Sequence, residues 1–141
     1  MDIVAFKSEH MLAMDIQDAQ ADARQFFNPG HLAYLEELDS FTVLFDGQPA
    51  MCIGWFEVYP TRALVWAVLA RSAGRHMTAL TRFVRRLVDG LPHRRVEAEV
   101  DAEFAPGHRW LEMLGFQCET PISLRSYNAH GGDSCLYSKV K

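Results

Sequence analysis

The sequence has no long hydrophobic run. Its apolar stretches are no longer than a β-strand, and Asp2, Lys7, Glu9 and Asp15 interrupt the beginning of the chain. A membrane-spanning helix needs about 20 consecutive apolar residues, and a secretory signal needs an apolar segment of about 7 to 15. We therefore expect no membrane partner, and we expect a cytoplasmic protein.

Cysteine is also scarce. The three cysteines, Cys52, Cys118 and Cys135, are far apart and odd in number, which argues against a disulfide framework. The six histidines include no H-x-x-x-H pair, and the three cysteines include no Cys-x-x-Cys pair, so the sequence offers no set of metal ligands. We expect free, buried thiols and no metal site.

Each of two stretches nearly lacks charge of one sign. Residues 1–40 hold eight acids, and Lys7 and Arg24 are their only lysine and arginine. Residues 71–95 hold seven of the 14 basic residues against a single acid, Asp89. A basic stretch of this kind suits a phosphate-bearing partner, although arginines on an exposed helix face would produce the same composition.

The remaining composition is typical of a folded protein, because 49% of the 141 residues are hydrophobic and 23% are charged. No repeat or linker divides the chain, so we expect one domain over residues 1–141. The predicted segments are a strand (3–7), helical pieces (8–26, capped by Ser8, and 31–38), a hairpin around Asp46-Gly47, a buried strand (63–70), a helix (76–90), a strand (95–101), a helix (105–114) and two strands (116–127 and 134–140). This order predicts an α/β fold with a mixed sheet.

Two stretches carry a family resemblance. Residues 71–76 form a glycine-containing loop between the apolar strand and a helix, where backbone amides at the positive helix end can hold a pyrophosphate. Residues 100–116 run from the end of a strand through a short helix to Gly115-Phe116. In this order the two stretches resemble the cofactor loop, Q/R-x-x-G-x-G/A, and the later strand–helix–strand motif of the GNAT superfamily of acetyl-CoA-dependent N-acetyltransferases.

The resemblance implies a GNAT fold, with a mixed central sheet of about six to seven strands flanked by about four helices. It also implies that backbone groups at the end of the strand pair with the pantetheine arm of acetyl-CoA, while the loop cradles the pyrophosphate. His76 stands where the family has Gly or Ala, so its side chain would either contact the phosphate or crowd it. The implied cofactor-binding residues are Val68, Leu69, Ala70, Arg71, Ala73, Gly74, Arg75, His76 and Met77.

The second motif departs from the family pattern. Phe104, Gly107 and Leu111 stand where the family has Asn, Ala and Tyr, and that Tyr is a frequent general acid for the departing thiolate. Residues 108–116 also resemble GNAT-like proteins encoded by tailed phages, including internal virion proteins. The alternative to an enzyme is therefore a non-catalytic GNAT-like phage structural or host-interaction protein with a degraded cofactor loop, which would place it in the virion.

Acetyl transfer needs a base for the amine proton. The resemblance places the acceptor site at the splayed ends of strands four and five, where carboxylates are the usual bases. Glu57 is the first candidate because it is an acid in an otherwise apolar strand, and Glu99 follows, beside Glu97 and Asp101. The alternative role for each of these acids is that of a solvent-facing strand residue. For the missing acid the candidates are Tyr59, Tyr127 and Tyr137, and the alternative role for each is that of a packed aromatic.

The expected partner is an amine-bearing small molecule or protein that accepts the acetyl group. A rival hypothesis, nucleic-acid binding through Arg82, Arg85 and Arg86, lacks a supporting motif and runs against the negative net charge, so we do not favour it. Arginines near the loop could instead meet the 3′-phosphate end of CoA. An edge strand near the C-terminus could pair two subunits, and a virion partner belongs to the phage alternative.

Overall fold

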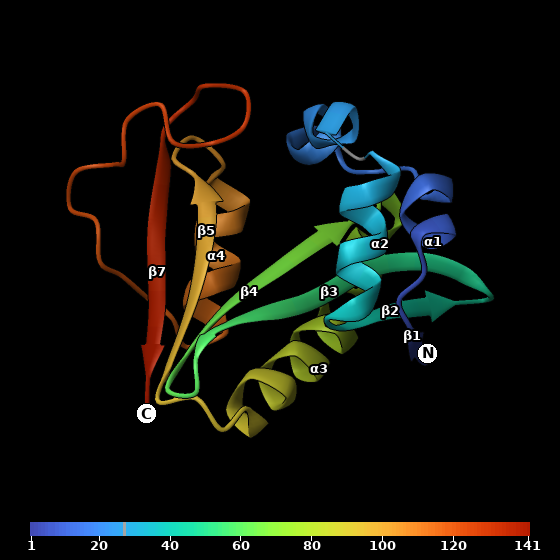
Figure 1. Cartoon of the computed structure of the whole chain (residues 1–141), viewed down its shortest axis with the longest axis horizontal. Helices are drawn as coiled ribbons and strands as arrows, with labels where there is room; N and C mark the ends of the chain where they lie inside the picture. The colour runs from blue at the N-terminus through green and yellow to red at the C-terminus, as the bar shows by residue number, and fades with distance from the viewer. Residues whose placement is uncertain (27) are drawn as a thin grey trace. The chain divides into compact units, whose positions relative to one another are not determined.

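The computed structural model of the chain describes residues 1–26 and 28–141, the side chains at positions 23, 25 and 26 excepted. Its strands form one sheet in the order β1-β2-β3-β4-β5-β7-β6, and Figure 1 labels each of them except β6. The elements are β1 (Asp2–Ala5), α1 (Ser8–Ala13), the 3-10 helix η1 (Asp18–Phe26), α2 (Pro29–Glu37), β2 (Asp39–Phe45), β3 (Gln48–Tyr59), β4 (Arg62–Leu69), the 3-10 helix η2 (Arg71–His76), α3 (Met77–Gly90), β5 (Arg95–Asp101), α4 (Ala105–Met113), β6 (Gln117–Cys118) and β7 (Ser134–Val140).

The sheet is mixed, as predicted. Strands β4 and β5 run parallel, with residues 62–64 opposite residues 95–97, whereas β5 and β7 are antiparallel along their whole length. A parallel neighbour requires a crossover connection, and η2 and α3 supply it. The seven described strands and four described α-helices confirm the predicted α/β fold class.

The chain forms two compact units. The first contains residues 1–56 and 65–76, and the second contains residues 57–64 and 77–141. Strands β3 and β4 contribute residues to both units. That residues 1–141 make one domain stays a prediction.

In the first unit, β1, β2 and β3 form an antiparallel meander. The hairpin between β2 and β3 turns at Asp46 and Gly47, whose φ angles are 51° and 75°. Two consecutive left-handed residues make the primed turn that matches strand twist, so the Asp-Gly prediction is confirmed. Helices α1 and α2 lie side by side (Figure 1). They share a buried cluster with β3 and β4: Phe6, Met11, Met14, Ile16, Leu32, Leu35, Cys52, Val68 and Ala70.

The predicted helical region 8–26 is divided in two. Helix α1 ends at Ala13, and the residues from Asp18 onward form η1. The prediction that Ser8 caps the first helix is wrong, because Lys7 holds the N-cap position. The Ser8 amide and hydroxyl instead donate to Glu36 of α2 at 2.5 and 2.8 Å. A partner distant in sequence therefore displaces the local cap.

In the second unit, α4 packs behind β5 (Figure 1). Gly107 is required at this contact, because a Cβ there would lie 2.7 Å from both Val100 and Phe104. The predicted strand 116–127 is wrong beyond Cys118. The Thr120 hydroxyl accepts the Leu136 amide at 3.1 Å, and Pro121 has no N–H for a sheet ladder, so regular pairing stops there.

The three cysteines are free, as predicted, but only one is buried. Cys52 lies in the core, and burial raises the pKa of its thiol to about 11. Cys118 is exposed and Cys135 is half-buried, which corrects the expectation of three buried thiols. No described helix has the length and apolar composition needed to cross a bilayer.

Gly54 provides a test of packing in the first unit. A Cβ at this position would lie 2.7 Å from the Asp39 carbonyl oxygen and 2.8 Å from the Trp66 ring. We expect Gly54→Ala to lower the free energy of unfolding by about 1–3 kcal/mol, since the rigid backbone must move. Gly90→Ala is the matched control, because a Cβ there meets nothing within 4 Å. Equal stability of the two variants in urea denaturation would show that this close contact is absent.

Candidate functional site

The predicted site residues fall in both units. The first unit holds the end of β4 and the loop after it, from Val68 to His76. The second unit holds Met77, Glu57, Glu99 and Tyr137. Each group is described in its own unit.

The predicted cofactor loop is a 3-10 turn leading into α3. It is η2, Arg71–His76, in which Ala73 is buried and Gly74 is exposed. A Cβ built on Gly74 would meet nothing within 4 Å, so packing among the described residues does not require glycine here. A bare backbone beside open space does permit close approach of a ligand.

Arg71 is engaged by acids from the N-terminal region. Its guanidinium lies 3.3 Å from an oxygen of Asp15 and 2.5 Å from an oxygen of Asp18. The hydrogen bonds to Asp18 and then Asp15 raise the pKa of Arg71. One arginine of the basic stretch is thus paired with acids of the N-terminal region in the same chain.

His76 stacks on an aromatic ring. Its imidazole lies parallel to Phe45 at the end of β2, with ring centroids 3.7 Å apart and 5° between the planes. This stacking holds the side chain against the end of the hairpin. The position of His76 in the sequence predicts that its side chain contacts or crowds a phosphate, but no local pattern indicates the stacking on Phe45.

Two glutamines missed by the sequence reasoning bind the backbone of β4. The side chain of Gln20 donates to the Ala67 carbonyl at 2.8 Å and accepts the Leu69 amide at 3.0 Å. The Gln17 amide donates to the Leu69 carbonyl at 2.9 Å. The spacing Gln-x-x-Gln carries no recognised signal, because both partners lie about 50 residues later in the chain.

The second unit has a groove between α3 and α4. Its volume is about 470 Å³, and the Trp110 indole donates to Thr81 across it at 2.9 Å. Apolar side chains combined with two guanidinium groups suit a ligand that carries both a ring system and a phosphate. The lining residues are Met77, Thr78, Thr81, Arg82, Pro106, Arg109, Trp110 and Met113.

Glu57 is paired with a buried histidine. One of its carboxylate oxygens lies 2.7 Å from Nε2 of His93, which is almost fully buried, whereas the Glu57 side chain is 56% exposed. The Nδ1 atom of His93 has no hydrogen-bond partner among the described residues. Glu57 therefore combines a fixed carboxylate with access to solvent, an arrangement that suits a proton acceptor.

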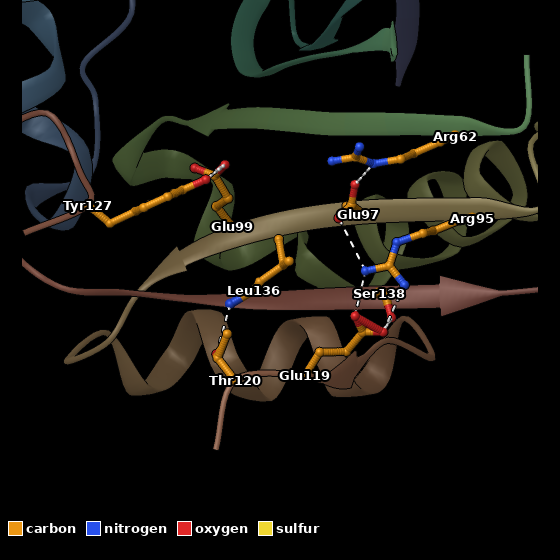
Figure 2. Close-up of polar contacts among 9 residues, drawn as sticks. All are labelled: Arg62, Arg95, Glu97, Glu99, Glu119, Thr120, Tyr127, Leu136 and Ser138. Carbon is orange, nitrogen blue, oxygen red and sulfur yellow. Dashed lines mark hydrogen bonds and ion pairs between the residues drawn. The ribbon is translucent and has the colours of Figure 1, made fainter. Parts of the chain in front are cut away.

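Glu99 pairs with a tyrosine from the segment before β7. The Tyr127 hydroxyl donates to the Glu99 carboxylate at 3.2 Å (Figure 2). The nearby charge of Glu99, followed by burial, raises the pKa of Tyr127. The phenol therefore keeps its proton more firmly than an isolated tyrosine does.

Tyr137 is buried, with 3% of its surface exposed. Its hydroxyl lies 2.7 Å from Nδ1 of His108, and Nε2 of the same ring lies 3.1 and 3.0 Å from the carbonyl oxygens of Asp101 and Ala102. Because carbonyls only accept, Nε2 carries a proton, and the Tyr137 hydroxyl shares a hydrogen bond with Nδ1. Burial is the main cause of a raised pKa for Tyr137. This geometry ties the start of α4 to β7.

A network of arginines and carboxylates crosses β5 (Figure 2). The Glu97 side chain, 4% exposed, contacts Arg62 and Arg95. Arg95 also donates to both oxygens of Glu119 at 2.9 and 2.5 Å, and the Ser138 hydroxyl donates to Glu119 at 2.5 Å. Glu97 is therefore a buried structural anion. Among the described residues no group of histidines, cysteines and acids could hold a metal ion.

Comparison with solved structures identifies the fold. No model of a protein family matches the sequence, and no curated protein sequence matches it. Solved structures do match. Ard1 from Thermoplasma volcanium has a TM-score of 0.79 at 15% identity, covering 99% of this chain and 96% of that one.

Two further structures extend the comparison. A GNAT-family acetyltransferase from Bacillus anthracis has a TM-score of 0.69 at 15% identity, covering 98% and 93% of the two chains. Ribosomal-protein-alanine N-acetyltransferase from Brucella melitensis has a TM-score of 0.67 at 13% identity and covers all of both chains. The chain therefore has the fold of GNAT acetyltransferases, as the two sequence motifs predict.

The network at Glu119 predicts a pH dependence of stability. Arg95 and then Ser138 lower the pKa of Glu119 from 4.5 to about 2. The stabilisation is fully present above pH 4.5 and is lost as the pH falls toward 2. The side chain is 38% exposed, so we expect Glu119→Gln to cost only about 1 kcal/mol at pH 7.

The measurement is urea denaturation at pH 7 and pH 2.5. The stability difference between Glu119→Gln and the unaltered protein should shrink at pH 2.5. Glu103→Gln, which removes an exposed carboxylate from the same unit, is the control. A difference of the same size at both pH values would contradict the lowered pKa.

Proposed function

We propose that the protein is an N-acetyltransferase that moves an acetyl group from acetyl-CoA to a primary amine. The observation that supports this most strongly is the fold, which is shared over nearly the whole chain with solved acetyltransferases. The residues after β4 add a second support, because Gly74 leaves its backbone open where the family binds pyrophosphate.

The parts of the co-substrate are assigned to separate elements. Backbone groups from Val68 to Ala70 would pair with the pantetheine arm, and the segment from Arg71 to Met77 would hold the pyrophosphate. The groove between α3 and α4 suits the adenosine end, since Arg82 and Arg109 supply positive charge beside apolar side chains. This assignment gives part of the arginine-rich stretch a function other than nucleic-acid binding.

The reaction forms a bond between the amine nitrogen and the acetyl carbon and breaks the carbon–sulfur bond of the thioester. The ammonium group of the acceptor must first lose a proton, and the departing thiolate must gain one. Glu57 is our first candidate for the base, because one of its oxygens is held by His93 and the side chain remains accessible. Glu99 is the second.

The proton donor to the thiolate is assigned to a tyrosine. Tyr127 is half-exposed and hydrogen-bonded to Glu99, so its proton could be replaced through that carboxylate. For Tyr137, which is buried and bonded to His108, we propose a positioning role at the start of α4.

The test measures turnover with a panel of amines, and the release of the CoA thiol reports each turnover. We expect Glu57→Gln to lower kcat by about 10²-fold or more, the range seen when a general base is removed. Glu103→Gln should leave kcat unchanged, because that exposed acid lies outside the proposed site.

Loss of turnover in Glu99→Gln but not in Glu57→Gln would move the base to Glu99. No turnover of any amine by the unaltered protein, together with no heat on titration of CoA, would contradict the proposed function.

A further inference from the structure

The end of β4 has one edge that β3 does not use. The Ala70 amide donates to the Ala50 carbonyl of β3 at 2.9 Å. Because neighbouring residues of a strand direct their backbone groups to opposite edges, the groups of Ala67 and Leu69 face away from β3. An unpaired edge of this kind can accept another extended chain.

The N-terminal region occupies this edge. One side-chain amide, that of Gln20, donates to the Ala67 carbonyl at 2.8 Å and accepts the Leu69 amide at 3.0 Å. It thus imitates the paired donor and acceptor of a neighbouring strand. Gln17 orients this amide, because its own Nε2 donates to Gln20 Oε1 at 2.8 Å.

The pairing continues past the end of the strand. The Gln17 amide donates to the Leu69 carbonyl at 2.9 Å, and Ile16 forms an isolated antiparallel bridge with Ala70. The Arg71 amide then donates to the Asp15 carbonyl at 2.8 Å. Four backbone groups in succession, from the Ala67 carbonyl to the Arg71 amide, are therefore taken by residues 15–20.

We propose that residues 15–20, here called the strap, close the pantetheine-binding edge of β4, and that the Gln20 end of the strap must leave this edge when acetyl-CoA binds. This inference rests on the proposed function, in which the backbone at the end of β4 pairs with the pantetheine arm. Of the residues assigned to the pantetheine arm, Leu69 directs its amide and its carbonyl to this edge, and the strap takes both groups. The strap and the pantetheine arm therefore compete for the edge, and the strap lowers the affinity for CoA.

The contacts that hold the strap are unequal in strength. Ile16 is 3% exposed and anchors one end in the core, while Arg24 donates to the carbonyls of Leu12 and Met14 at the end of α1. The Gln20 side chain is only half-buried, and the ion pairs of Arg71 with Asp15 and Asp18 are exposed. Exposed ion pairs and single hydrogen bonds contribute little each. The Gln20 end can thus leave the edge while Ile16 stays in place.

Competition of this kind has a measurable size. Affinity for a ligand falls by the fraction of molecules in the open state. Loss of the two Gln20 hydrogen bonds at about 1 kcal/mol each would favour the open state and tighten CoA binding by about 5- to 30-fold. Removal of the exposed Asp18 carboxylate should tighten it by only about 2-fold.

The experiment is calorimetric titration of the full chain with CoA. Gln20→Met keeps the length of the side chain and removes its polar atoms, and Asp18→Asn weakens the ion pair with Arg71. Asp22→Asn, an exposed acid one turn further along η1, is the matched control. Thermal unfolding of each variant checks that the fold is retained.

We expect CoA to bind Gln20→Met about 5- to 30-fold more tightly than the unaltered protein and the control, with Asp18→Asn between them. Equal affinity in all four proteins would overturn the strap while leaving the proposed function standing. Absence of CoA binding to all four would overturn the proposed function and the strap with it.

Discussion

The hydrogen bonds along the edge of β4 that faces away from β3 are the constraint on which the candidate site depends. Backbone donors and acceptors of a strand require partners, and here the partners are a side-chain amide and the backbone of residues 15–17. This pairing fixes the position of η1, brings Asp15 and Asp18 to Arg71, and covers groups that the proposed co-substrate needs. Folding of the first unit and access to the proposed site are thus linked by one set of contacts.

The contacts around β4 and η2 in the first unit differ in kind from those around β5 in the second unit. Around β4 and η2 the contacts are exposed ion pairs, single hydrogen bonds and one stacked imidazole, that of His76 on Phe45. Around β5 they are a nearly buried carboxylate, Glu97, held by two arginines, and a fixed histidine–tyrosine pair. A weakly held edge permits exchange of one partner for another, whereas the second set favours a fixed scaffold for acids such as Glu57 and Glu99.

Local patterns in the sequence predicted the elements whose causes are local. The Asp46-Gly47 turn, the alternation of β5 and strand β7 could each be located because turn chemistry and side-chain period act within a few residues. Ser8 was assigned incorrectly as a cap because its partner, Glu36, comes from another helix. Likewise the strand after Phe116 is short because Thr120 and Pro121 interrupt its ladder.

In the candidate site too, features with a local cause could be predicted from the sequence, whereas features with distant partners could not. A glycine loop between a strand and a helix is a local signal, and it predicts that residues 71–76 form a cofactor loop. Gln17 and Gln20 carry no such signal, because their role appears only when β4 lies beside them. The same holds for the acidic N-terminal stretch, because two of its acids, Asp15 and Asp18, contact Arg71 more than 50 residues later in the chain.

Native-state amide hydrogen exchange of the protein without ligand tests the occupied edge most directly. The Leu69 and Arg71 amides point to the strap, whereas the Ala70 amide points to β3. We predict that all three amides are protected, with Leu69 and Arg71 exchanging far more slowly than exposed amides. Exchange of Leu69 and Arg71 at the rate of exposed amides, with Ala70 still protected, would contradict an edge closed by residues 15–20.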